Sequence, residues 1–121
     1  MKCGCKSGTH GPLNESDYLF QLAQAALREN NTKKAIDLVR RAVTINPVHV
    51  GYLTALGELL LSDRRFGEAL IVLKKALAFK PHCSEIYFNM GLAADGLNDK
   101  RAAAQYFAQA GLLHPDCKTT N

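Results

Sequence analysis

The sequence of 121 residues lacks tryptophan and contains only four tyrosines and five phenylalanines. No apolar run approaches the ~18 residues that a membrane-spanning helix needs, and residues 1–12 have no apolar core of the kind found in secretory signals. We therefore expect no membrane insertion and a cytoplasmic location, in which the four cysteines should be thiols.

The sequence also lacks the motifs by which many enzymes are recognised. No Ser/His/Asp or Cys/His pair has the spacing of an activated nucleophile, and there is no Gly-rich phosphate-binding loop. The net charge of +4 comes from basic residues interspersed with acidic ones, and no aromatic residues alternate with the pairs Arg40-Arg41 and Lys74-Lys75. We predict neither an enzyme nor a nucleic-acid-binding protein.

Only Cys3 and Cys5, with His10 nearby, suggest a metal or redox site. Two thiols in a polar tail are incomplete for zinc, which takes four ligands. We expect no metal and no cofactor, and keep a metal or thiol-redox role as a distant alternative that metal analysis would test.

A regular period is the strongest feature that is present. It relates three series of small residues and prolines, each evenly spaced: Ala35, Ala69 and Ala103; Ala42, Ala76 and Ala110; Pro47, Pro81 and Pro115. A period of roughly 34 residues is typical of helix-turn-helix solenoids. Apolar residues at helical spacing predict six helices, near residues 16–29, 33–45, 50–62, 67–79, 84–96 and 100–113. The predicted caps are Ser16 or Asp17, Thr32, Ser84 and Asp99.

These residues resemble the tetratricopeptide repeat (TPR) family in three tandem copies, residues 16–49, 50–83 and 84–117. The repeats form one domain over residues 16–115, between a flexible tail (1–15) and a short C-terminal tail (116–121). The resemblance rests on in-phase Leu or aromatic, small and proline residues, with Gly57 and Gly91 matched by Ala23 in the first copy. It implies an all-α fold, a right-handed α-solenoid of three helix-turn-helix units.

The resemblance also implies a concave groove that binds a peptide or helix of a partner protein. The groove residues it selects are Phe20, Gln24, Leu27, Thr54, Glu58, Leu61, Phe88, Asn89 and Leu92. Leu27 and Leu61 could instead belong to the core. Some family members grip acidic C-termini with basic groove residues, but no cation occupies the matching positions here and Glu85 would repel an acidic tail. We expect an apolar or mixed-polarity partner.

The last repeat suggests an interface of its own. Ala104 and Gly111 are small where earlier repeats carry larger apolar residues, yet three large side chains remain: Tyr106, Phe107 and Leu113. The chain could be a fragment of a longer protein, or this end could be covered by a partner helix or a second copy. A self-assembling module, a homo-oligomer formed through this end, is therefore the alternative function.

Overall fold

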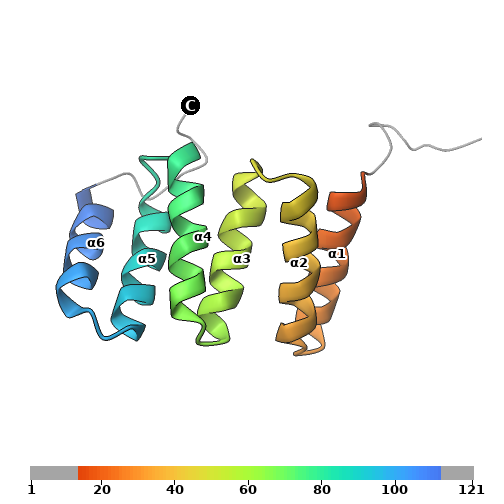
Figure 1. Cartoon of the computed structure of the whole chain (residues 1–121), viewed down its shortest axis with the longest axis horizontal. Helices are drawn as coiled ribbons and strands as arrows, with labels where there is room; N and C mark the ends of the chain where they lie inside the picture. Colours follow the sequence, from red (N-terminus) through yellow and green to blue (C-terminus); the bar gives the residue numbers. More distant parts are fainter. Residues whose placement is uncertain (1–13, 113–121) are drawn as a thin grey trace, which may run out of the picture. The chain divides into compact units, whose positions relative to one another are not determined.

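The computed structural model describes residues 14–112, and six α-helices are the only regular elements among them. The predicted all-α repeat fold is confirmed. The chain divides into two compact units, residues 1–47 and 48–121, which are described separately below. The helices are α1 (Glu15–Arg28) and α2 (Thr32–Ile45) in the first unit, and α3 (Val50–Ser62), α4 (Phe66–Phe79), α5 (Ser84–Gly96) and α6 (Lys100–Leu112) in the second (Figure 1).

In the first unit α1 and α2 form an antiparallel hairpin. The face of α1 that bears Leu19, Ala23 and Ala26 is buried, as are Ala35 and Ala42 on α2. Small residues on both helices allow their backbones to approach closely. This contact accounts for the alanines that recur with the repeat.

The three turns between the paired helices share one backbone conformation. Asn30, Arg64 and Asn98 occupy the same position of successive repeats and all have positive φ, between 61° and 67°. In each turn the next residue donates its backbone N–H to a carbonyl five positions earlier, as Asn31 does to Ala26 at 2.8 Å. This is the usual left-handed way to end a helix, and the turn predicted at Asn30 is confirmed.

Some of the predicted helix caps are wrong. At α1 the cap is Asn14, whose side chain accepts from the backbone N–H of Asp17 at 2.9 Å and from the Ser16 hydroxyl at 2.6 Å. At α2 the cap is Asn31, which accepts from the N–H of Lys34 at 3.2 Å. Asparagine caps as well as serine or threonine does, so the earlier residue takes the role and the helix begins sooner.

At α5 the residue before the helix is Cys83, so Ser84 is the first helical residue and not the cap. Asp99 does cap α6, because its side chain accepts from the N–H of Ala102 at 3.1 Å. Cys83, the only cysteine among residues 14–112, is buried and disulfide-bonded. The expectation that every cysteine is a thiol is therefore wrong for Cys83.

In the second unit α3 to α6 pack as two successive hairpins, and α5 contacts both α4 and α3. The largest fully buried side chains of this unit are Leu53, Leu60, Leu73, Ile86 and Met90. Glycines set the closest approaches: a Cβ on Gly57 would lie 2.6 Å from Leu73 Cδ2. No helix within residues 14–112 is long and apolar enough to span a membrane.

Candidate interaction surface

The predicted groove residues of the second unit lie on α3 and α5. We call this surface the α3–α5 face and define it by Thr54, Glu58, Leu61, Phe88, Asn89 and Leu92, together with Glu85, which lies beside Glu58. Phe88 is 50 % exposed and Leu92 is 40 % exposed, whereas Leu61 is half-buried. The structure therefore places two large apolar side chains of α5 in contact with solvent, and their assignment to a binding groove stays a prediction.

Asn89, which was predicted for the groove, forms a hydrogen bond between the two helices of this face. Its side chain is 7 % exposed, and its Nδ2 donates to Glu58 Oε2 at 3.4 Å. The Thr54 hydroxyl donates to the carbonyl of Val50, one turn earlier in α3, at 2.8 Å. Asn89 therefore ties α5 to α3, and Thr54 is satisfied within its own helix.

Two carboxyl groups meet on the α3–α5 face. Burial raises the pKa of Glu58 above its usual value of 4.5, the nearby carboxyl of Glu85 raises it further, and the hydrogen bond from Asn89 lowers it. A like charge and partial desolvation both disfavour the ionised form. The pair makes this surface acidic, and a cation beside it would reduce the repulsion between the two carboxyl groups.

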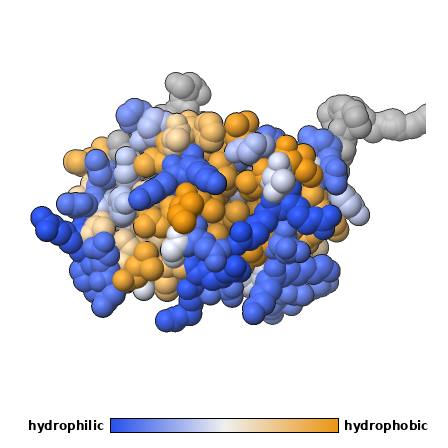
Figure 2. All heavy atoms as spheres, in the orientation of Figure 1, coloured by the Kyte–Doolittle hydropathy of each residue, from blue (hydrophilic) through white to orange (hydrophobic). Residues whose placement is uncertain are grey.

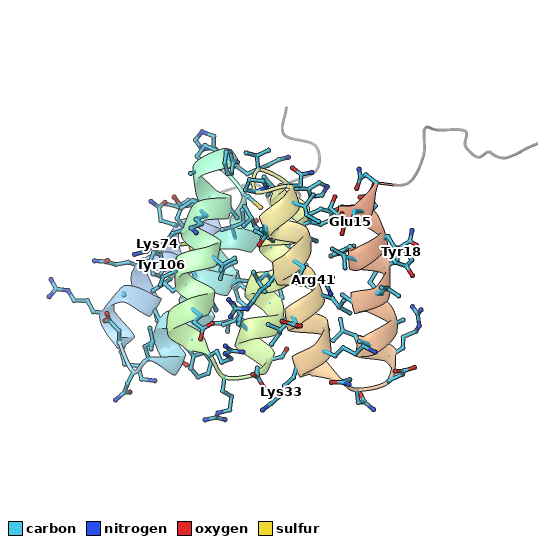
Figure 3. All side chains as sticks on the ribbon, turned by 45° about the vertical axis from the view of Figure 1, so that its right-hand side comes forward. Glu15, Tyr18, Lys33, Arg41, Lys74 and Tyr106 are labelled. Atoms are coloured by element: carbon cyan, nitrogen blue, oxygen red, sulfur yellow. The ribbon has the colours of Figure 1, made fainter. Side chains whose placement is uncertain are left out.

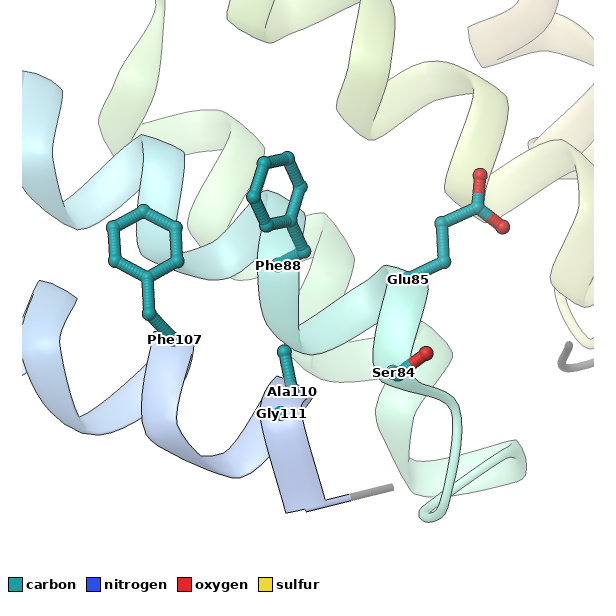
Figure 4. Close-up of a pocket in the computed structure, with 6 residues that line it drawn as sticks. All are labelled: Ser84, Glu85, Phe88, Phe107, Ala110 and Gly111. Atoms are coloured by element: carbon teal, nitrogen blue, oxygen red, sulfur yellow. The ribbon is translucent and has the colours of Figure 1, made fainter. Parts of the chain in front are cut away.

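A pocket of about 560 Å³ lies beside Phe88, between the start of α5 and the end of α6. We call it the α5–α6 pocket; its lining residues are Ser84, Glu85, Phe88, Phe107, Ala110 and Gly111 (Figure 4). The rings of Phe88 and Phe107 lie next to each other in its lining, with centroids 5.5 Å apart and planes inclined at 49°. Phe88 was predicted for the groove and Phe107 for the open end, and the structure brings them together.

The other predicted open-end residues differ in exposure. Ala104 and Gly111 are exposed, while Tyr106 is half-buried. A Cβ on Gly111 would meet no atom within 4 Å, so there is open space beside this residue. Leu113 lies outside the described residues.

The remaining groove candidates lie on α1, in the first unit. Phe20 is half-buried, Gln24 is exposed and Leu27 is 39 % exposed. Leu27 is thus not a core residue. The assignment of these three residues to a binding groove stays a prediction.

The sequence analysis missed a second exposed surface on α1. Tyr18 is 54 % exposed and Leu22 is 37 % exposed, and Tyr18 projects from α1 on the side away from α2 (Figure 3). The helical spacing had placed Leu22 on the same buried face as Leu19. The counterparts of Tyr18 and Leu22 two repeats later, Ile86 and Met90, are buried on α5, and this difference within the repeat is the signal that distinguishes the α1 surface.

The basic side chains of α2 and α4 are spread over the surface. The cations Arg41, Lys74 and Lys75 are exposed on α2 and α4, and Figure 2 shows hydrophilic atoms alternating with apolar ones over the face on which α4 lies. Within residues 14–112 no three His, Cys, Asp or Glu side chains come together as a metal site would require. Cys3, Cys5 and His10 lie outside the described residues.

Comparisons with known proteins agree on the fold. Tetratricopeptide repeat profiles match residues 20–83 and residues 84–116. A comparison with curated protein sequences found no significant match.

Among solved structures, a crystal structure of MamA protein superposes with a TM-score of 0.74 at 26 % identity, over 78 % of this chain and 52 % of that one. MamA 41-end from Desulfovibrio magneticus RS-1 gives a TM-score of 0.78 at 24 % identity, over 84 % of this chain and 57 % of that one. The chain thus spans about half the length of these MamA structures.

The second TPR of Spaghetti (RPAP3), bound to the HSP90 peptide SRMEEVD, superposes with a TM-score of 0.76 at 17 % identity, over 84 % of this chain and 94 % of that one. At this identity the likeness concerns the fold alone. The matched profiles cover most of the chain, and the second begins where the third predicted repeat begins. The chain belongs to the tetratricopeptide repeat family.

Proposed function

We propose that the protein is an interaction module whose α3–α5 face binds a peptide or helix of a partner protein. The observation that carries this proposal is the exposure of Phe88 and Leu92 one helical turn apart on α5, beside a pocket that Phe107 also lines. Apolar side chains gathered on a surface usually mark a site of interaction. A partner would cover them with apolar side chains of its own.

The number of large apolar side chains on the face determines the affinity we expect. Each large apolar side chain that a partner buries contributes about 1.5–3 kcal/mol. Anchors at Leu61, Phe88 and Leu92 would together support a dissociation constant on the order of micromolar, since part of the gain is lost in ordering the partner. Such an affinity suits a reversible adaptor or scaffold.

The carboxyl pair on the α3–α5 face sets the partner's charge. Glu58 and Glu85 would repel an acidic segment such as SRMEEVD, the peptide in the RPAP3 structure. A lysine or arginine next to an apolar anchor would instead pair with them. We therefore propose a partner segment that is apolar with a neighbouring basic residue.

Selection from a random peptide library displayed on phage would test this function. We expect the wild type to select peptides that combine an aromatic or aliphatic residue with Lys or Arg. Phe88→Glu/Leu92→Glu should lose these peptides. The matched control is Ile71→Glu, which changes a 59 % exposed apolar residue on α4 and should retain them.

Two results would contradict the proposal. One is retention of the selected peptides by Phe88→Glu/Leu92→Glu when circular dichroism shows its helices intact. The other is equal loss in the Ile71→Glu control, which would indicate nonspecific adhesion to exposed apolar residues.

A further inference from the structure

The contact between α5 and the preceding hairpin shows how one helix seats on a repeat of this chain. Ile86 is 0 % exposed and Met90 is 2 % exposed, because α5 packs against α4 and α3. The space left at the start of α3 is a pocket of about 220 Å³ that residues of both helices line, among them Val50 and Thr54 of α3 and Ile86 of α5. We call the surface of the α3–α4 hairpin on which α5 packs the seat of that hairpin.

The equivalent surface recurs one repeat later, on the α5–α6 hairpin. Ser84, Glu85 and Phe88 of the α5–α6 pocket are the counterparts of Val50, Gly51 and Thr54. Among the described residues of this unit no further helix lies on it, and the pocket is about 560 Å³. The α5–α6 hairpin therefore presents a vacant place of the kind that α5 fills on α3–α4.

Helix α1 carries the matching face. Tyr18 and Leu22 occupy the repeat positions of Ile86 and Met90, and both are exposed. Helix α1 packs against α2, and Tyr18 projects from the opposite side of α1 (Figure 3). Within residues 14–112, one copy of the chain thus contains both a seat that no described helix covers and an exposed apolar helix face.

We propose that the chain self-associates head to tail, with the Tyr18 and Leu22 face of α1 of one copy seated on the α5–α6 pocket of the next, as α5 sits on α3–α4. This inference goes beyond peptide binding by the α3–α5 face. Because the two surfaces differ, the contact is heterologous and each added copy leaves one free seat. The proposal therefore predicts open linear oligomers whose length increases with protein concentration.

The charges along the proposed contact are compatible with it. Within the chain, the repeat relation that joins Asn89 to Glu58 would place Gln21 of α1 next to Leu92 of the other copy. It likewise places Asp17 of α1 at the position of Glu85, which lies beside Glu58. Asp17 would then face Leu92 instead of a carboxyl group, so the like-charge contact of α3 and α5 is not repeated.

Sedimentation velocity of the full chain, with variants on each surface, tests the proposal. On α1 the variant is Tyr18→Glu/Leu22→Glu, with Tyr18→Glu alone as a milder form. In the pocket the variant is Gly111→Glu, which has open space for its side chain, and Gly111→Ala is its matched control. None of these substitutions changes a residue of the α3–α5 face.

We expect the wild type and Gly111→Ala to grow in mean mass from about 10 µM to about 1 mM, while Tyr18→Glu/Leu22→Glu and Gly111→Glu stay monomeric. Mixed in equal amounts, these two variants should form a discrete dimer, since one retains the seat and the other retains the α1 face. A wild type that is monomeric throughout would overturn the proposal. So would oligomers of Tyr18→Glu or of the α1 double variant alone, which would indicate pairing of two α5–α6 ends.

Discussion

A Cβ atom added to Gly91 would lie 2.4 Å from Cε1 of Phe107. Helices α5 and α6 therefore touch at this point with no room for a methyl group. The counterpart one repeat earlier, Gly57 against Leu73, is similarly tight at 2.6 Å. The close approach also holds the Phe107 ring beside Phe88, so the shape of the α5–α6 pocket depends on a glycine that does not line it.

In Gly91→Ala the methyl group displaces the Phe107 ring in a packed contact, which costs about 1–3 kcal/mol. The gain of about 1 kcal/mol that alanine brings to a helix offsets part of this cost, so the free energy of unfolding should fall by up to about 2 kcal/mol. Urea denaturation followed by circular dichroism measures the free energy of unfolding of the variant and of the wild type. Gly67→Ala, whose Cβ would meet nothing within 4 Å, is the control and should be neutral or stabilising. Equal effects at the two sites would contradict the contact.

Arg64 differs in residue type from the asparagines at the same position of the other two repeats. It adopts the left-handed backbone conformation that asparagine supplies at Asn30 and Asn98. A side chain with a Cβ and no local hydrogen-bonding group costs about 1–2 kcal/mol there. We predict that Arg64→Asn raises the melting temperature and that Asn98→Arg lowers it. Ion pairs do not confound the comparison, since it is Arg65 that pairs with Asp63 and Glu68.

Much of the fold could be predicted from the sequence because the period and the helical spacing are local properties. The bounds of α3 and α5 agree with prediction to the residue, and the turns fall where Asn30 and Asn98 stand. The predicted caps of α1 and α2 were wrong because two cap-forming residues lie close together at each helix start. The sequence does not show which of the two is the N-cap.

The site was harder to predict because exposure depends on which helix lies against a given face. Periodicity assigns Leu22 and Met90 the same role, but α5 has a helix beside Met90 and the described contact of α1 is with α2. Asn89 was expected at the surface, and only the position of Glu58 on the neighbouring helix draws it into a buried hydrogen bond. Such differences between equivalent positions arise from packing.

The raised pKa of Glu58 makes stability depend on pH. Burial, then Glu85, raise this pKa in the folded state above 4.5, so the folded chain binds the proton more tightly than the unfolded chain does. Stability should therefore fall as the pH rises from about 4.5 through the raised pKa. Glu58→Gln keeps an acceptor for Asn89 and should remove this part of the fall, which makes the variant more stable than wild type at about pH 7.

Urea denaturation of Glu58→Gln and wild type from about pH 3.5 to about pH 8 measures this difference. Glu68→Gln is the control, because Glu68 forms an exposed ion pair with Arg65 at 3.2 Å and such pairs contribute little. A constant difference between Glu58→Gln and wild type at every pH would show that the carboxyl group does not titrate abnormally.

Phe88 belongs to both proposed contacts, since it lies on the α3–α5 face and also lines the α5–α6 pocket. A peptide on the face and a second copy in the pocket should therefore compete, and each should weaken the other by the same factor. We predict that the apparent affinity of wild type for a selected peptide falls as protein concentration rises, because oligomers occupy the site. Gly111→Glu, which should stay monomeric, is expected to bind with one affinity at all concentrations. Fluorescence anisotropy of a labelled peptide measures both, and concentration-independent binding by a wild type that does form oligomers would show that the two contacts are separate.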